Sequence, residues 1–334
     1  MLLTVVIPVY NEADVLPLLL AALRRVLAGL DCSWEILFVN DGSTDSTGAI
    51  LGQAAAEDRR FRVIEFTRNF GHQAAVTAGV DFASGNAVVV MDADLQDPPE
   101  LLPEMLRLIR QGFDVVSAQR VSRARDGWLK RRTAEWFYWF MRRMVDPRLA
   151  SEVADFRMFS RRAVDAIRQF REQHRFMRGL VAWLGLKEIT VPFDRPARAA
   201  GQTKYPLLKM IRFAWTAISS FSALPLRLSV GAGFATAFFG LVYSLHTVYL
   251  AVVRKVTVPG WTSLVCLQFI FSGATLIAIG LVGEYIARIY EELKSRPLYV
   301  VARTVNLGFP AVAPDKALVI GEEQPAAQAA PAAR

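Results

Sequence analysis

Short apolar runs alternate with stretches of helical spacing over the first 120 residues of the chain. Apolar, mostly β-branched runs predict five strands, at residues 2–7, 34–39, 61–66, 87–91 and 113–118. Apolar positions three and four residues apart predict the intervening helices, at residues 11–29, from after residue 45 to about 57, and at 71–83 and 101–110. Strands that alternate with helices over this length predict an α/β fold with a doubly wound, mainly parallel sheet.

Beyond residue 205 the apolar stretches are much longer. Residues 206–227 place apolar side chains on one helical face, which predicts amphipathic helices lying in a membrane surface. Residues 228–253 carry no formal charge, and a second such stretch starts at residue 261. Each is longer than the about 20 residues that cross a bilayer. We therefore predict a transmembrane hairpin, at about 228–253 and 261–285, with both termini in the cytoplasm.

This pattern divides the chain into five predicted parts. They are a globular domain at 1–205, interfacial helices at 206–227, the hairpin at 228–290, a cytoplasmic extension at 291–310 and a disordered tail at 311–334, which is rich in Ala and Pro. The first residues lack the basic n-region of a signal peptide, which agrees with a cytoplasmic N-terminus.

Composition supports a membrane protein. The 334 residues are 53% hydrophobic with a mean hydropathy of +0.27, and the excess lies mostly in the last third. The net charge of +8 suits an anionic membrane or nucleic acid, but no zinc-finger, RNP or basic-zipper pattern accompanies it, so nucleic acid is not expected. Cys32 and Cys266 are too few and too far apart for a disulfide framework or a metal cluster.

Acidic and amide side chains follow the fourth predicted strand directly. In an extended chain Asp92, Asp94 and Gln96 share one face, and they offer only oxygen ligands, which suit Mg²⁺ or Mn²⁺. The carboxyl end of a buried strand is also where open α/β sheets bind ligands. The alternative is an acidic loop tip, and it explains Asp97 and Glu100 better, as the N-cap and the capping box of the next helix.

The loops after the first two strands emerge at the same edge of the sheet. Tyr10 can stack on a base, while Glu12 and Asp41 can accept hydrogen bonds from a base or ribose. Turn chemistry is the alternative. We prefer it for Gly42 and Ser43, and for Asp41 both interpretations stay open. No dinucleotide G-x-G-x-x-G follows a strand and no P-loop sequence occurs, which argues against those two classes.

Basic residues gather in two further places. Residues 119–143 interleave arginines with aromatic side chains, which suits a bilayer headgroup region, although a solvated basic helix explains part of the pattern. Arg120 differs because it follows a strand at the ligand edge. Residues 198–205 place Arg198 and Lys204 around a glycine and a hydroxyl, a loop that can wrap an anion.

Several of these segments together resemble a known family. Residues 6–12, 40–45, 68–72, 92–97 and 198–205 are similar to the inverting family 2 glycosyltransferases. The likeness is strongest to the polyprenyl-phosphate sugar transferases, which include bactoprenol glucosyltransferases and dolichol-phosphate mannose synthases. It spans residues 2–301, and no Gln-x-x-Arg-Trp motif points to a processive polysaccharide synthase.

The resemblance implies a GT-A fold and transfer of one sugar from a nucleotide-sugar to polyprenyl phosphate at the cytoplasmic face of the inner membrane. It implies these site residues: Asp92, Asp94 and Gln96 for Mg²⁺ or Mn²⁺ and the diphosphate; Pro8, Tyr10, Glu12, Asp41 and Asp92 for the nucleotide; Arg120, Arg131, Arg198 and Lys204 for the acceptor phosphate. Asp94 and Asp155 are the implied catalytic residues, with Asp155 either orienting the sugar or acting as a base.

Donor and partners follow from the family alone. UDP-glucose is the family-weighted expectation, while UDP-linked amino-arabinose, a UDP-N-acetylhexosamine and GDP-mannose stay open. A homo-tetramer and a lipid-sugar flippase are expected partners. A non-catalytic membrane module that binds a nucleotide-sugar is the alternative of another class, and the intact acidic set disfavours it. A two-helix transporter is a poorer match, since His246 is the one candidate for a charge inside the membrane.

Overall fold

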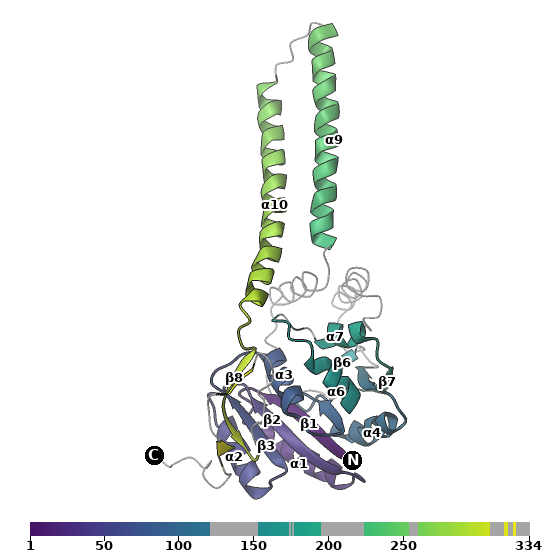
Figure 1. Ribbon diagram of the computed structural model, residues 1–334, viewed down its shortest axis with the longest axis vertical. Coiled ribbons are helices and arrows are strands. Elements are labelled where there is room, and N and C mark those ends of the chain that lie inside the picture. Colours follow the sequence, from purple (N-terminus) through teal and green to yellow (C-terminus); the bar gives the residue numbers. More distant parts are fainter. Residues whose placement is uncertain are drawn as a thin grey trace. The chain divides into compact units, whose positions relative to one another are not determined.

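The computed structural model describes residues 1–120, 153–173, 175, 177–194, 224–253, 260–307, 317–319 and 323–324 (Figure 1). The chain divides into two compact units, one made of Met1–Pro206 with Arg296–Arg334 and the other of Leu207–Ser295. The interfacial helices predicted before residue 224 and the basic, aromatic stretch after Arg120 lie outside the described residues.

One mixed sheet forms the first unit. Its strands are β1 (Leu2–Val9), β2 (Ser33–Asn40), β3 (Phe61–Phe66), β4 (Ala87–Val90), β5 (Val115–Arg120), β6 (Val153–Ser160), β7 (Glu188–Phe193), β8 (Tyr299–Val305), β9 (Ala317–Val319) and β10 (Glu323–Gln324). They lie in the order β10-β8-β3-β2-β1-β4-β6-β5-β7, with β9 paired to β8. The first four strands are parallel, whereas β6 is antiparallel to β4 and β5, and β8 is antiparallel to β3. The predicted doubly wound, mainly parallel sheet is confirmed.

Helices cover both faces of this sheet. They are α1 (Leu16–Ala28), α2 (Thr47–Glu57), α3 (His72–Phe82), the 3₁₀ turn η1 (Pro99–Leu101), α4 (Leu102–Arg110), α6 (Arg161–Arg168) and α7 (Met177–Leu184). The core under α1, α2 and α4 contains Val5, and the core under α3, α6 and α7 contains Val6. Successive side chains of a strand point to opposite faces, so the continuous apolar run of β1 supplies both cores.

Helix α3 packs unusually close to β1. A Cβ atom on Gly79 would collide with the side chain of Val6, so the contact requires glycine at this position. Only a residue without a side chain leaves room for the Val6 side chain against the backbone of α3. The separation between α3 and the centre of the sheet is therefore fixed.

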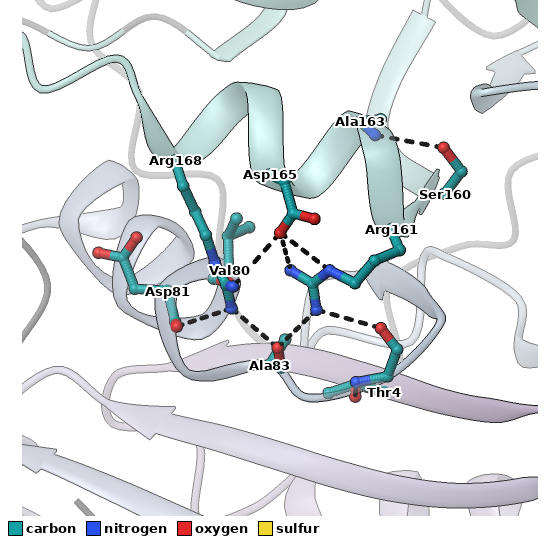
Figure 2. A network of polar contacts seen from close by, with 10 residues as sticks. Thr4, Val80, Asp81, Ala83, Ser160, Arg161, Ala163, Asp165 and Arg168 are labelled. Atoms are coloured by element: carbon teal, nitrogen blue, oxygen red, sulfur yellow. Dashed lines mark hydrogen bonds and ion pairs between the residues drawn. The ribbon is translucent and has the colours of Figure 1, made fainter. Parts of the chain in front are cut away.

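The carboxyl end of α3 is capped by two arginines of α6 (Figure 2). Arg168 and Arg161 donate at 2.8–3.2 Å to backbone carbonyls of Val80, Asp81, Ala83 and Gly85. Ser160 is the N-cap of α6, and its Oγ accepts the N–H of Ala163 at 3.2 Å. Cations at a helix carboxyl terminus satisfy free carbonyls and complement the dipole. These contacts hold α3 in position along its axis.

Strands β6, β8, β9 and β10 differ from the sequence prediction. The predicted strands do not include β6, which lies between β4 and β5 and bonds to both. They also omit β8, which falls in the stretch predicted as an extension outside the globular domain. Tyr299 of β8 is fully buried, and its ring stacks on Phe66 with 5.3 Å between centroids. The short strands β9 and β10 form within the tail predicted to be disordered. The unpaired backbone groups of an edge strand can pair with a segment that is distant in the sequence. The local sequence pattern does not predict such a pairing.

The second unit contains two long helices that pack against each other, α9 (Leu224–Val253) and α10 (Trp261–Leu293). At their contact a Cβ on Gly240 would lie 3.2 Å from the ring of Phe271. Among the described residues, one segment, Ile270–Leu293, is long and apolar enough to span a membrane, and the apolar stretch Leu228–Tyr243 of α9 is shorter. The helical pair is present, and its two membrane crossings stay a prediction.

Candidate functional site

The three parallel strands β2, β1 and β4 end side by side at one edge of the sheet. The chain order reverses on the two sides of β1, and this switch point is where open α/β sheets bind ligands. The loops that carry Tyr10, Asp41 and Asp92 therefore lie at one edge, as the sequence predicts.

Hydrogen bonds join the loop after β1 to the loop after β2. The N–H of Asn11 donates to Ser43 Oγ at 3.0 Å, and Asn11 Oδ1 accepts the N–H of Thr44 at 2.8 Å. Asp45 Oδ2 accepts the N–H of Ala13 at 3.3 Å. Asn11 itself has a φ of 54°, a left-handed conformation that asparagine tolerates. The hydroxyl of Ser43 thus takes part in turn chemistry, in line with the sequence interpretation.

The predicted nucleotide residues of the first loop differ in exposure. Tyr10 is 46% exposed, so its ring is accessible to a base. Glu12 is half-buried, and its N–H donates to Thr47 Oγ1 at 3.0 Å. Pro8 is buried within β1. Of these three residues, Tyr10 presents the most side-chain surface at the edge.

Asp41 is almost fully buried, at 3% exposure. Its Oδ1 accepts the N–H of Phe70 at 2.6 Å and its Oδ2 accepts the N–H of Gly71 at 2.9 Å. Burial raises the pKa of Asp41, although the two N–H donors and the charges of His72 and Arg68 act in the opposite direction. Asp41 thus anchors the loop between β3 and α3, and any contact with a nucleoside would use its remaining lone pairs.

The acidic segment after β4 forms a turn, which differs from the extended chain assumed in the sequence argument. The strand ends at Val90, and Leu95 has a φ of 59°. Within the turn Asp94 Oδ1 accepts the N–H of Gln96 at 3.1 Å. Asp92, Asp94 and Gln96 are nevertheless all half-buried, so each has some accessible surface at the carboxyl edge.

Asp97 and Glu100 are structural, but not as a capping box. The N-cap position of η1 falls on Pro98, whose side chain cannot cap. Asp97 is 2% exposed, and its Oδ2 accepts the N–H of Asp92 at 3.0 Å, which closes the acidic turn. Glu100 forms an exposed ion pair with Arg25 at 2.8 Å. The capping-box prediction is therefore wrong, and the structural assignment of both residues is right.

Strand β6 brings Asp155 to the same edge. Arg157 pairs with Val90, the last residue of β4, and Asp155 lies two residues earlier on β6. Asp155 and Arg157 both line a small cavity of about 10 Å³, together with His72 at the start of α3. His72 Nε2 lies 3.8 Å from Asp92 Oδ1. The turn after β4, the start of α3 and the central strand β6 thus converge on one site.

Sequence reasoning assigned no role to His72 or Arg157. His72 follows the third predicted strand at the ligand edge, which is a usable signal. Arg157 lies two residues from Asp155, and alternation within a strand would have placed both on one face. Because β6 was not among the predicted strands, that signal went unused.

The predicted acceptor residues fall mostly outside the described residues. The backbone of Arg120 ends β5, and its side chain is not among the described ones. Arg131, Arg198 and Lys204 lie outside the described ranges altogether. Within the described part of the chain, no three His, Cys, Asp or Glu side chains gather as ligands for a metal ion.

Comparisons with known proteins identify the relatives of this chain. Residues 4–168 match the model of glycosyl transferase family 2. The uncharacterized glycosyltransferase YkcC of Bacillus subtilis strain 168 is 42% identical over 304 residues, which cover 91% of this chain and 94% of the relative. The prophage bactoprenol glucosyl transferase homolog of Escherichia coli K12 is 37% identical over 303 residues, 91% and 99% of the two chains. The bactoprenol glucosyl transferase of Shigella phage SfII is 38% identical over 304 residues, 91% and 98%.

Among solved structures, glucosyl-3-phosphoglycerate synthase from Mycobacterium tuberculosis, in complex with Mn²⁺, uridine diphosphate and glucosyl-3-phosphoglycerate, is similar at 16% identity. Its TM-score is 0.48, over 65% of this chain and 77% of that chain.

Proposed function

The chain belongs to glycosyl transferase family 2 and has a GT-A fold, and we propose that it transfers one sugar from a nucleotide-sugar to polyprenyl phosphate. The observation that carries this proposal is the near full-length similarity to bactoprenol glucosyl transferases, at 37–38% identity over 90–91% of this chain. The product would be a polyprenyl-phosphate sugar, formed with inversion at the anomeric carbon.

The reaction depends more on neutralising the negative charges of the two reactants than on a strong base. A phosphate monoester has a second pKa near 6, so at neutral pH the acceptor is already largely an anionic nucleophile. The protein must hold two negatively charged reactants together and stabilise the departing diphosphate. A carboxyl edge that carries acidic side chains on one loop and cations from other segments meets both needs.

The acidic turn fits a divalent cation of the Mg²⁺ type. Mg²⁺ keeps several waters and binds through one or two carboxylates plus substrate phosphates, so it does not require a trio of protein ligands. Asp92 and Asp94 supply two half-buried carboxylates and Gln96 an amide oxygen, all on one turn. We propose that these three residues hold Mg²⁺ or Mn²⁺, which when bound neutralises the leaving diphosphate.

The neighbouring loops would bind the nucleoside. Tyr10 offers an exposed ring for stacking on the base, next to Glu12 and the buried Pro8. Asp41 holds the Phe70–Gly71 segment behind this surface, so its contribution is to the shape of the pocket and, through free lone pairs, to the base or ribose.

On the other side of the acidic turn, Asp155 would face the transferred sugar. We propose that it orients the sugar or acts as a base of modest importance. Arg120, Arg131, Arg198 and Lys204 would bind the acceptor phosphate, because cations and a wrapping loop suit an anion.

Membrane attachment would bring the lipid acceptor to this domain. The apolar segment Ile270–Leu293 supports association with a membrane. We propose the inner membrane, two crossings by α9 and α10, and a cytoplasmic catalytic domain with both termini on that side. The homo-tetramer and the flippase partner stay predictions.

A donor panel tests the proposal. Purified protein is incubated with Mg²⁺, undecaprenyl phosphate and radiolabelled UDP-glucose, UDP-N-acetylglucosamine, UDP-4-amino-4-deoxy-arabinose or GDP-mannose. We expect label to enter the organic phase with one donor, UDP-glucose first, and only when the lipid phosphate is present. Absence of organic-phase label with every donor, or equal label without the lipid, would contradict the proposed transfer.

A further inference from the structure

A buried cation lies directly beside the candidate catalytic aspartate. Arg157 is 5% exposed and lines the same cavity as Asp155. Arginine keeps its charge at any physiological pH. A guanidinium removed from water needs opposite charge close by, and Asp155 is the acidic residue among the described ones that line this cavity. The cation therefore belongs to the electrostatics of the site.

The position of Arg157 is determined by backbone pairing on both sides. It pairs with Val90 of β4 and with Ser117 of β5, so the strand that carries it cannot shift along its axis. Asp155 lies two residues earlier on β6, and its side chain lines the same cavity as Arg157. This cavity lies on the face of the sheet that α3 covers, since Val90 lines it and belongs to the core beneath α3.

The cavity between these side chains is very small. At about 10 Å³ it has room for at most one water molecule, so little solvent separates the side chains that line it. His72 closes the same cavity from the first turn of α3, whose other end is fixed by Arg161 and Arg168. A planar guanidinium with several fixed donors is well suited to hold a carboxylate in one orientation.

We propose that Arg157 is the positioning residue for Asp155, holding its carboxylate toward the sugar-transfer site beside Asp92 and His72. The inference rests on the proposed function and deepens it. Arg157 touches neither substrate nor metal in this account, and it acts only through Asp155. Its loss should lower kcat and leave donor binding unchanged, because the nucleoside surface and the acidic turn stay intact.

A double-mutant cycle tests this role. The four proteins are wild type, Arg157→Lys, Asp155→Asn and the double variant, assayed with the donor that the panel identifies and undecaprenyl phosphate. We expect Arg157→Lys to lower kcat about tenfold with the donor KM within about twofold, as for loss of a group that orients a reacting residue. The double variant should be no slower than Asp155→Asn alone, since residues that act as a unit are not additive.

A second arginine, largely but not fully buried, provides the matched control. Arg171 is 11% exposed and pairs with Asp81 at 2.7 Å, near the far end of α3 from His72. Arg171→Lys tests the general effect of shortening a buried arginine, and its effect should multiply with that of Asp155→Asn. If the kcat reductions of Arg157→Lys and Asp155→Asn multiplied in the double variant, the inference would be overturned. A raised donor KM with kcat unchanged, or equal coupling of Arg171 to Asp155, would also overturn it.

The cycle is also measured by thermal unfolding of the same four proteins. If the wild type used no donor in the panel, the proposed transfer would fail, and the unfolding cycle would still decide the pairing. Shifts in Tm that do not add for Arg157→Lys and Asp155→Asn support it, and additive shifts overturn it.

Discussion

The loops after β2 and β4 each place an aspartate at the carboxyl edge of one sheet, yet the two carboxylates are in opposite situations. Asp41 is 3% exposed, and both of its oxygens accept backbone N–H groups of the loop before α3. The side chain of Asp92 is 37% exposed and faces His72 across 3.8 Å. Residues of the same type, on loops at the same edge, thus serve different purposes.

The two aspartates therefore have different roles: Asp41 stabilises the loops that form the site, and Asp92 is accessible to a ligand. A buried carboxylate with two N–H donors fixes a loop, and replacing it leaves those donors without partners. A half-exposed carboxylate retains lone pairs for a ligand, and replacing it changes charge more than packing. We therefore expect variants of the acidic turn to lose activity with little loss of stability. Variants around Asp41 should lose stability more than activity.

The largest effect is expected at the acidic turn. Asp94→Asn should lower kcat for sugar transfer about 100-fold or more, the scale on which lost charge stabilisation acts. Its free energy of unfolding should stay within about 0.5 kcal/mol of wild type, because the side chain is half-buried. Organic-phase label and urea denaturation measure the two quantities. Turnover within twofold of wild type, or full activity in excess chelator, would contradict the metal assignment.

Asp41→Asn should mainly affect stability. The amide keeps one acceptor oxygen but sets an NH₂ group against either the Phe70 or the Gly71 N–H. One buried donor is then unpaired, which should cost about 1–3 kcal/mol of unfolding free energy. Urea denaturation of Asp41→Asn beside Asp94→Asn checks the contrast. Equal stability of the two variants would contradict the structural role assigned to Asp41.

Gly71→Ala probes the same loop through the backbone. Gly71 has a φ of 99° and a ψ of 156°, a conformation open essentially to glycine, and no described atom lies within 4 Å of the position that a Cβ would take. Backbone strain alone should therefore destabilise the variant by about 1–3 kcal/mol, measured by thermal unfolding.

Gly112→Ala is the control for this variant, because Gly112 also has a positive φ, of 90°, and lies away from the site. Both substitutions should lower Tm, but only Gly71→Ala should raise the donor KM, since its loop lies beside the nucleoside surface. An equal rise in KM for both variants would show that the loop around Gly71 has no specific part in donor binding.

The smallest effect concerns Asp45, which joins the two nucleoside loops. Burial opposes its ionisation, but hydrogen bonds from Thr47 and Ala13 outweigh burial and lower its pKa. A lowered pKa contributes stability above the unfolded value of about 3.9, and that stability is lost as the pH falls through the folded value. Asp45→Asn should be about 0.5 kcal/mol less stable at neutral pH. This difference in stability between wild type and Asp45→Asn should disappear below about pH 4 in denaturation curves. A difference that grows below that pH would contradict a lowered pKa for Asp45.

Much of the sheet could be predicted because its strands and helices have distinct periods. The runs that became β1, β2, β3 and β4 are apolar and bounded by turn residues, so the location of the acidic turn was available from the sequence. The internal geometry of that turn was not. Local hydrogen bonds such as that from the Asp92 N–H to Asp97 decide it, and propensities do not distinguish them from a capping box.

The sequence by itself determined the order of the first strands and helices, the acidic turn after β4 and the long apolar helices, since each depends on neighbours along the chain. Only the tertiary structure decided that β6 enters between β4 and β5 and that Tyr299 is buried in a strand that follows α10 along the chain. Strand pairing depends on which strand edges come together in space, and several segments far apart in the sequence could pair with the same edge. That pairing, with Arg157 opposite Val90, is what brings Asp155 to the carboxyl edge, where it lines a cavity with His72.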